Sequence, residues 1–222
     1  MGKQLFIGLT TEGSTDIRFL ESIVRRTFQH IAYNECKQDI DIVIQNIKFV
    51  PKKGLGFAEY VVEASKQGVE DFGCMVLAVH TDADRETYAK RIEDKFNPAQ
   101  KLLDREDDSV CKIITPIIPI RMIEAWMLAD KDLFRQELGT NLSFNELGIN
   151  RDPEIMADPK AEIEEAIRRA FDHQSRRRRH LEISELYELL GDKISIEKLE
   201  TLLSYRNFQD EVRKTYATLN YR

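Results

Sequence analysis

The chain has 222 residues, of which 42% are hydrophobic and 32% are charged, and its formal net charge is −6. This many apolar residues exclude a disordered chain and suffice for a core. The negative charge argues against a protein that coats DNA tightly, but it is compatible with a nuclease whose metal site concentrates carboxylates.

The sequence carries no pattern typical of membrane insertion or export. No apolar run approaches the roughly 20 residues that cross a bilayer. The short apolar run at residues 5–9 is followed by polar residues instead of a cleavage site. Cys36, Cys74 and Cys111 form no CxxC pair, which argues against a zinc ribbon or a disulfide framework. We therefore expect a cytoplasmic protein that has no membrane contact.

The first predicted elements are a strand, a turn and a helix. Residues 4–10 form an apolar run typical of a short buried strand, and Gly13 permits a tight turn after it. Residues 14–16 are good helix caps, and apolar side chains then recur at helical spacing as far as Phe28.

Strands and helices continue to alternate along the first half of the chain. Residues 74–79 are continuously apolar, which indicates a strand buried on both faces and places Cys74 in the core. Pro116 suggests that the strand around it is an edge strand or contains a bulge. The other elements predicted here are strands at residues 40–50 and 112–118 and helices at residues 57–67, 85–103 (interrupted or ended near Pro98) and 120–127.

The order of the elements predicts an α/β fold with a parallel sheet sandwiched by helices. After residue 133 no strand pattern appears, and amphipathic helices are expected at residues 159–171, 183–190, 196–203 and 208–216. We therefore divide the chain into an α/β core at residues 1–133 and a helical extension at residues 134–222 that packs on the core.

Acidic side chains follow two of the predicted strands. Glu12 comes after the first strand, and Asp82 and Asp84 come after the third. The carboxyl ends of parallel strands line the ligand crevice of an open sheet. If the backbone stays extended as far as Asp84, the two aspartates face the same side. Carboxylates grouped in this way repel one another unless a cation neutralises them, and Mg²⁺ and Mn²⁺ prefer oxygen ligands.

Simpler explanations compete with a metal site. An aspartate after a strand often caps the next helix, and Asp-x-Asp arises by chance in an acidic chain. Glu12 is equally open to being a solvated turn residue. Capping alone does not explain a glutamate before a glycine turn, so the combination at two strand ends favours a shared metal ion.

The segments LFIGLTTEGSTD and MVLAVHTDADR resemble the toprim (topoisomerase–primase) domain, which carries a glutamate after its first strand and an Asp-x-Asp after its third. The segment IPIRMIEAWMLAD narrows the resemblance to toprim-related proteins with EGxTD, HxDAD and EAW motifs, near the overcoming-lysogenization-defect nucleases. The resemblance covers roughly residues 4–130. It implies a toprim-like sheet, Mg²⁺ or Mn²⁺ as the cofactor, and a bacterial anti-phage setting.

The resemblance implies roles for particular residues. Glu12 is expected to be a metal ligand or the general base, and Asp82 and Asp84 are expected to be metal ligands. Glu124 of the EAW motif has no place in the minimal toprim core. Related nucleases use further acids for a second metal, which makes Glu124 a candidate ligand, with a solvent-facing helix acid as the alternative.

Several other side chains are candidates for contact with substrate. A cation near the developing phosphorane charge assists phosphoryl transfer, and Lys160 is our candidate, with Arg121 and Arg85 as others; plain surface charge is the alternative for each. His80 is either a substrate or water contact or a satisfied strand-end histidine. Trp126 is expected in the core. The basic run at residues 176–179 either contacts phosphates or is a solvated charge run.

The leading hypothesis is metal-dependent phosphodiester hydrolysis by a nuclease that acts on DNA or RNA. Two alternatives come from other classes of protein. The first is a non-catalytic regulatory subunit that docks on an ATPase partner. The second is a hydrolase of a small phosphate ester, which the acidic charge mildly favours.

Overall fold

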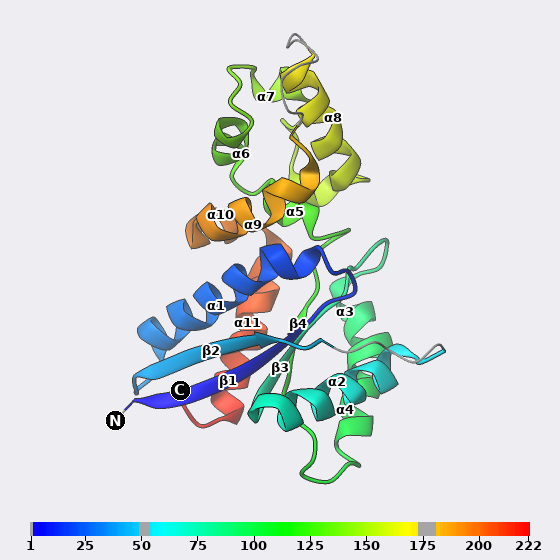
Figure 1. Ribbon diagram of the computed structural model, residues 1–222, viewed down its shortest axis with the longest axis vertical. Helices are drawn as coiled ribbons and strands as arrows, with labels where there is room; N and C mark the ends of the chain where they lie inside the picture. The colour runs from blue at the N-terminus through cyan, green and yellow to red at the C-terminus, as the bar shows by residue number, and fades with distance from the viewer. Residues whose placement is uncertain (1, 49–53, 173–180) are drawn as a thin grey trace.

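The computed structural model describes residues 2–48, 54–172 and 181–222, so the basic run at residues 176–179 lies outside the described residues. Within the described residues, one four-stranded parallel sheet has the order β2-β1-β3-β4 (Figure 1). The predicted α/β class is therefore confirmed. The strands are β1 (Lys3–Thr10), β2 (Ile40–Asn46), β3 (Val76–His80) and β4 (Ile114–Ile117).

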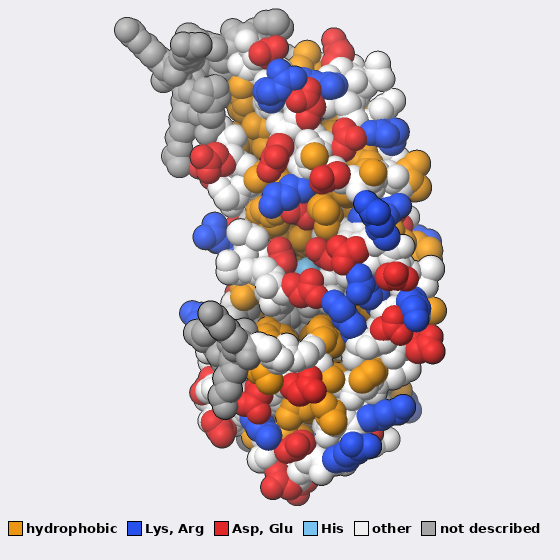
Figure 2. Space-filling model, turned by 90° about the vertical axis from the view of Figure 1, so that its right-hand side faces the viewer, with side chains coloured by type: hydrophobic (Ala, Val, Ile, Leu, Met, Phe, Trp, Pro, Cys, Tyr) orange, Lys and Arg blue, Asp and Glu red, His pale blue; other side chains and the backbone are white. Residues whose placement is uncertain are grey.

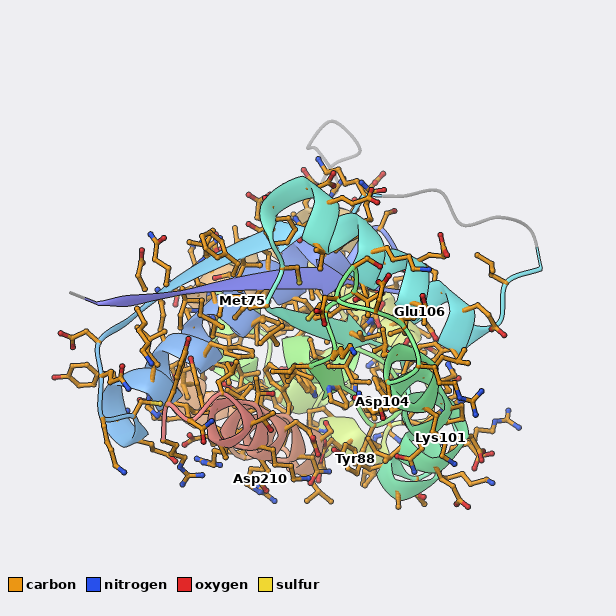
Figure 3. The ribbon with its side chains drawn as sticks, turned by 90° about the horizontal axis from the view of Figure 1, so that it is seen from below. Met75, Tyr88, Lys101, Asp104, Glu106 and Asp210 are labelled. Atoms are coloured by element: carbon orange, nitrogen blue, oxygen red, sulfur yellow. The ribbon has the colours of Figure 1, made fainter. Side chains whose placement is uncertain are left out.

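Helices cover both faces of the sheet (Figure 3). One face packs against α1 (Asp16–Glu35) and α11 (Leu203–Thr218), and the other against α2 (Phe57–Phe72) and α4 (Asn97–Leu103). Every residue of β3 is buried, as its continuous apolar run predicts, because helices lie on both sides of it. In the described part of the chain, no helix is long and apolar enough to cross a membrane.

Beyond the carboxyl ends of the strands, short helices form a second group at one end of the molecule (Figure 1). They are α5 (Glu124–Met127), α6 (Lys131–Glu137), α7 (Phe144–Leu147), η2 (Pro153–Ile155), α8 (Pro159–Phe171), α9 (Ile183–Lys193) and α10 (Ile196–Leu199). The helix predicted at residues 120–127 is a single turn, and α10 is shorter than predicted. Trp126 is fully buried, as predicted, and its Nε1 donates to Ser204 Oγ at 2.7 Å.

The last helix, α11, returns from this group to the sheet. The hydroxyl of Thr215 on α11 lies 2.7 Å from that of Thr115 on β4, and Tyr216 donates a hydrogen bond to the carbonyl of Phe28 on α1. The part of the chain after residue 133 thus supplies one of the helices that cover the sheet. The boundary between residues 133 and 134 stays a prediction.

The segment between β3 and β4 differs from the single helix predicted at residues 85–103. It consists of α3 (Tyr88–Arg91), a π-helical turn η1 (Ile92–Phe96) and α4. The predicted helix is divided near Pro98, as expected: η1 ends at Phe96, and Pro98 lies in the first turn of α4, where a missing N–H is tolerated. Tyr88 links this segment to α11 by donating to Glu211 Oε1 at 2.6 Å, and Figure 3 shows it beside Asp210.

Gly191 provides a test of how closely α9 packs on α1. A Cβ atom at this position would lie 2.6 Å from the backbone oxygen of Phe19. Gly191→Ala is therefore expected to lower the free energy of unfolding by about 1–3 kcal/mol, the usual effect of overpacking. Chemical denaturation measures it, with exposed Glu188→Ala on the same helix as the control. Equal stability of the two variants would contradict the observed packing.

Candidate active site

The acidic residues of the predicted site lie where the strands end, at the waist between the sheet and the outer helices. Figure 2 shows Asp and Glu side chains gathered there, with Lys and Arg side chains next to them. Within this region we define the acidic cluster as Glu12, Asp16, Asp82 and Glu124. These residues come from the turn after β1, the start of α1, the segment after β3 and the start of α5.

The turn after β1 positions the first two members of the cluster. The Thr11 hydroxyl donates to the carbonyl of Gly13 at 2.7 Å, and the amide of Gly13 donates to Asp16 Oδ2 at 3.1 Å. A carboxylate in the first turn of α1 also suits the positive end of the helix dipole. The turn therefore presents both Glu12 and Asp16 at the carboxyl end of β1.

His80, the last residue of β3, lies between two carboxylates. Its Nε2 is 3.2 Å from Asp82 Oδ1, and its Nδ1 is 3.5 Å from Asp16 Oδ2 without a hydrogen bond. The side chain is fully buried; burial alone lowers the pKa of His80, but Asp82 and Asp16 outweigh this effect and raise it. Burial raises the pKa of Asp16. The histidine therefore ties the end of β1 to the end of β3.

Glu124 reaches the cluster because the segments after β3 and β4 continue side by side. The amide of Thr81 donates to Ile117 and that of Ala83 to Pro119. Glu124 is 5% exposed, and its Oε1 accepts a hydrogen bond from the hydroxyl of Tyr187 at 2.5 Å. Burial raises the pKa of Glu124, and the charges of Asp82 and Asp16 raise it further. The solvent-facing alternative for Glu124 is therefore wrong.

Asp84 does not follow the extended backbone on which its pairing with Asp82 depended. Its φ is +53°, in the left-handed region, and its amide donates to the carbonyl of Arg121, whose φ is +67°. Its carboxylate is 65% exposed and accepts from Arg91 at 2.7 Å. The structure thus places Asp84 next to the cluster with its carboxylate bound to Arg91, so the expectation that both aspartates face one side is wrong.

Lys160 and Lys95 differ in their relation to the cluster. Lys160 is exposed in the first turn of α8, and within the described part of the chain no hydrogen bond or ion pair joins it to the cluster, so its predicted role at the scissile phosphate stays a prediction. Lys95, in η1, instead donates to Glu12 Oε1 at 2.8 Å and to the hydroxyl of Thr81 at 2.5 Å. Thr81 also donates to Glu12. Burial alone would raise the pKa of Glu12, but the hydrogen bonds from Lys95 and Thr81 outweigh this effect and lower it.

Sequence reasoning missed Asp16, Lys95 and Tyr187. Asp16 had a signal, because it stands four residues after Glu12 at a helix start, where two carboxylates can flank one turn. Lys95 had none, since a π-helical turn that redirects it is not visible in the spacing of apolar residues. Tyr187 is 63 residues from Glu124 in sequence, and only the packing of α9 brings it close.

The cluster is negative overall and does not by itself form a closed metal centre. Among residues 2–48, 54–172 and 181–222, no three His, Cys, Asp or Glu side chains are placed so that they hold a metal ion as they stand. Glu12 is held by Lys95, and Asp82 by His80. Burial raises the pKa of Asp16 despite His80 at 3.5 Å, and the charge of Asp82 adds to the rise. Burial also raises the pKa of Glu124, to which Asp82 and Asp16 add.

Fold and site together define an α/β protein with an acidic cluster at the carboxyl edge of a parallel sheet. A family model described as a domain of unknown function, DUF4276, matches residues 11–211, so the chain belongs to this family. Neither the curated proteins nor the solved structures gave a match.

Proposed function

We propose that the protein hydrolyses phosphodiester bonds with Mg²⁺ or Mn²⁺ bound at the acidic cluster. The observation that carries the proposal is the convergence of Asp16, Asp82 and Glu124, whose burial and mutual repulsion raise the pKa of Asp16 and Glu124. Carboxylates so placed are stabilised by a cation. The toprim resemblance of the segments that carry these acids supports the same reading.

The donor set fits a hard divalent cation in its chemistry. It offers carboxylate oxygens, which Mg²⁺ and Mn²⁺ prefer, and the described residues of the cluster contribute no thiolate that would favour a softer metal. The buried Nδ1 of His80 lies 3.5 Å from Asp16 Oδ2 and makes no hydrogen bond. The polar groups of the cluster are therefore not fully satisfied by one another. The residues proposed to hold the cation are Glu12, Asp16, Asp82 and Glu124; Asp84 stays a predicted ligand whose carboxylate would have to leave Arg91.

The surrounding residues orient the ligands and prepare the reaction. When bound, the cation lowers the pKa of an attacking water and stabilises negative charge on the phosphate. Glu12, whose pKa is held low, is charged at neutral pH, as a carboxylate that binds a cation must be. His80 fixes Asp82, and Tyr187 fixes Glu124, as outer partners of metal ligands commonly do.

Nucleic acid is the proposed substrate, in line with the nuclease relatives that the sequence resembles. Arg91 and Arg121 lie against Asp84 at the rim of the cluster, where they are placed to attract a phosphate backbone. The anti-phage setting and an ATPase partner enter this proposal through the resemblance alone. A regulatory subunit would have no need for buried carboxylates that repel one another, which favours the enzyme.

A direct test combines metal titration with an activity screen. Calorimetric titration with Mn²⁺ is expected to show binding to the wild-type protein that is lost in Asp16→Asn. Single- and double-stranded DNA, RNA and bis(p-nitrophenyl) phosphate are then incubated with Mg²⁺ or Mn²⁺. Cleavage of a polynucleotide supports the nuclease, and cleavage of the small ester alone supports the alternative hydrolase. No binding and no cleavage with either metal would refute the proposal.

A further inference from the structure

We propose that Lys95 is a substrate-phosphate contact that rests on Glu12 in the metal-free protein and is released when Glu12 binds a divalent cation. This inference rests on the proposed function and deepens it. It makes Lys95, and not Lys160, the cationic side chain that meets the substrate. It also makes the metal-free and metal-bound states differ in the position of one ammonium group.

The first argument is the location of the Lys95 ammonium. It donates to both Glu12 and Thr81 and lies 5.0 Å from the centre of the Phe57 ring. Its side chain is only 22% exposed. A lysine confined in this way, at the carboxyl edge of the sheet and on a proposed metal ligand, is not a plain surface charge.

The second argument is the backbone that carries Lys95. Residues Ile92–Phe96 form a π-helical turn between two α-helical segments. Such turns are rare and occur frequently at functional sites, and the extra residue changes the direction of the side chains that follow it. Phe96 in the same turn is buried and packs edge-on against Phe57, which anchors the turn on α2. The turn thus directs Lys95 at the strand ends.

The third argument is electrostatic. An ammonium group bonded to Glu12 and a divalent cation bound by the same carboxylate repel each other strongly at this separation. Lysine has a long, flexible stem, and its ammonium can leave without a change in the backbone. The Lys95 side chain then becomes available to a phosphate oxygen beside the metal, where developing negative charge favours a cation.

Lysine labelling with an N-hydroxysuccinimide ester, read out by mass spectrometry, tests the release directly in the wild-type protein. Lys95 is expected to be protected without metal, to become severalfold more reactive with saturating Mg²⁺, and to be protected again when a non-cleavable phosphorothioate oligonucleotide is added. Lys131, which donates to the carbonyl of Arg151, serves as the internal reference and is expected to stay unchanged.

Two variants at Lys95 separate its roles. Lys95→Met is expected to bind Mn²⁺ more tightly, by about tenfold or 1.4 kcal/mol, because a competing charge is removed. The same variant is expected to bind the oligonucleotide more weakly in Ca²⁺, and Lys95→Arg is expected to restore part of that binding. Thermal unfolding of both variants confirms that they are folded.

The outcomes distinguish this inference from the proposed function. If Mn²⁺ binds in a manner that depends on Asp16 but Lys95 labelling does not change with metal, the inference is wrong and the metal site stands. Unchanged oligonucleotide affinity in Lys95→Met would also overturn the inference. If Mn²⁺ does not bind at all, both the proposed function and the inference fail.

Discussion

Asp82→Asn is expected to lower the rate of metal-dependent phosphodiester cleavage by about 100-fold or more. Even the outer hydrogen-bond partners of metal ligands are worth about 10–100-fold in affinity or activity, and Asp82 is proposed as a ligand itself. The substitution keeps the shape of the side chain and one oxygen near His80, which lies 3.2 Å from the carboxylate. Its effect is therefore expected on metal binding and rate, with little change in fold.

The measurement is the initial rate on the best substrate of the screen at saturating Mn²⁺, together with a calorimetric Mn²⁺ titration. Asp132→Asn is the matched control, because Asp132 lies in the first turn of α6 and pairs with Arg135 away from the cluster. Its rate is expected to equal that of the wild type. A rate for Asp82→Asn within twofold of the control would show that the cluster is not the reaction centre.

Glu124→Gln is expected to stabilise the metal-free protein at neutral pH and to reduce the stabilisation by metal. The pKa of Glu124 is raised by burial above the ordinary value of 4.5. The folded protein therefore favours the protonated form of Glu124. Protonated Glu124 contributes its full stability below the ordinary pKa, and this contribution is lost as the pH rises through the pKa that Glu124 has in the folded protein. Glutamine keeps an oxygen for Tyr187 without acquiring a charge.

Thermal unfolding in EDTA between about pH 4 and pH 8 measures this effect. The melting temperature of Glu124→Gln is expected to exceed that of the wild type only toward the upper end of this pH range. The difference is expected to be about 2–4 °C for each kcal/mol by which the substitution stabilises the protein. Added Mg²⁺ at about 100 times Kd is expected to stabilise the wild type by about 2.7 kcal/mol and the variant by less. A pH-independent difference between the two proteins would contradict a buried, titrating Glu124.

The parallel α/β architecture could be predicted from the sequence because it depends on local patterns. The apolar run before His80 has only one stable location, the interior of a sheet covered on both faces, and the confirmed strand β3 lies there. The glycine turn after β1 likewise follows from residue types with strong local preferences. The positions of Glu12 and Asp82 at adjacent strand ends follow directly from these elements.

The details that only the tertiary structure decided depend on contacts distant in sequence. Asp84 departs from an extended backbone because its amide donates a hydrogen bond to the carbonyl of Arg121, 37 residues later, and its carboxylate accepts one from Arg91. The Asp-x-Asp spacing contains no information about that second segment. The same holds for Pro98, whose effect depends on where the surrounding helix begins.

The sequence by itself thus determined a parallel sheet whose strand ends carry Glu12 and Asp82. The apolar runs before these residues mark buried strands, and the alternation of strands with helices indicates that the strands are parallel. Only the tertiary structure decided three contacts of the site: Glu124 with Tyr187, His80 with Asp16 and Asp82, and Lys95 with Glu12. These contacts join segments from β1, β3, η1, α5 and α9, and their energies depend on burial and charge around each side chain. The pairing of such groups is set by packing, which a local sequence pattern does not specify.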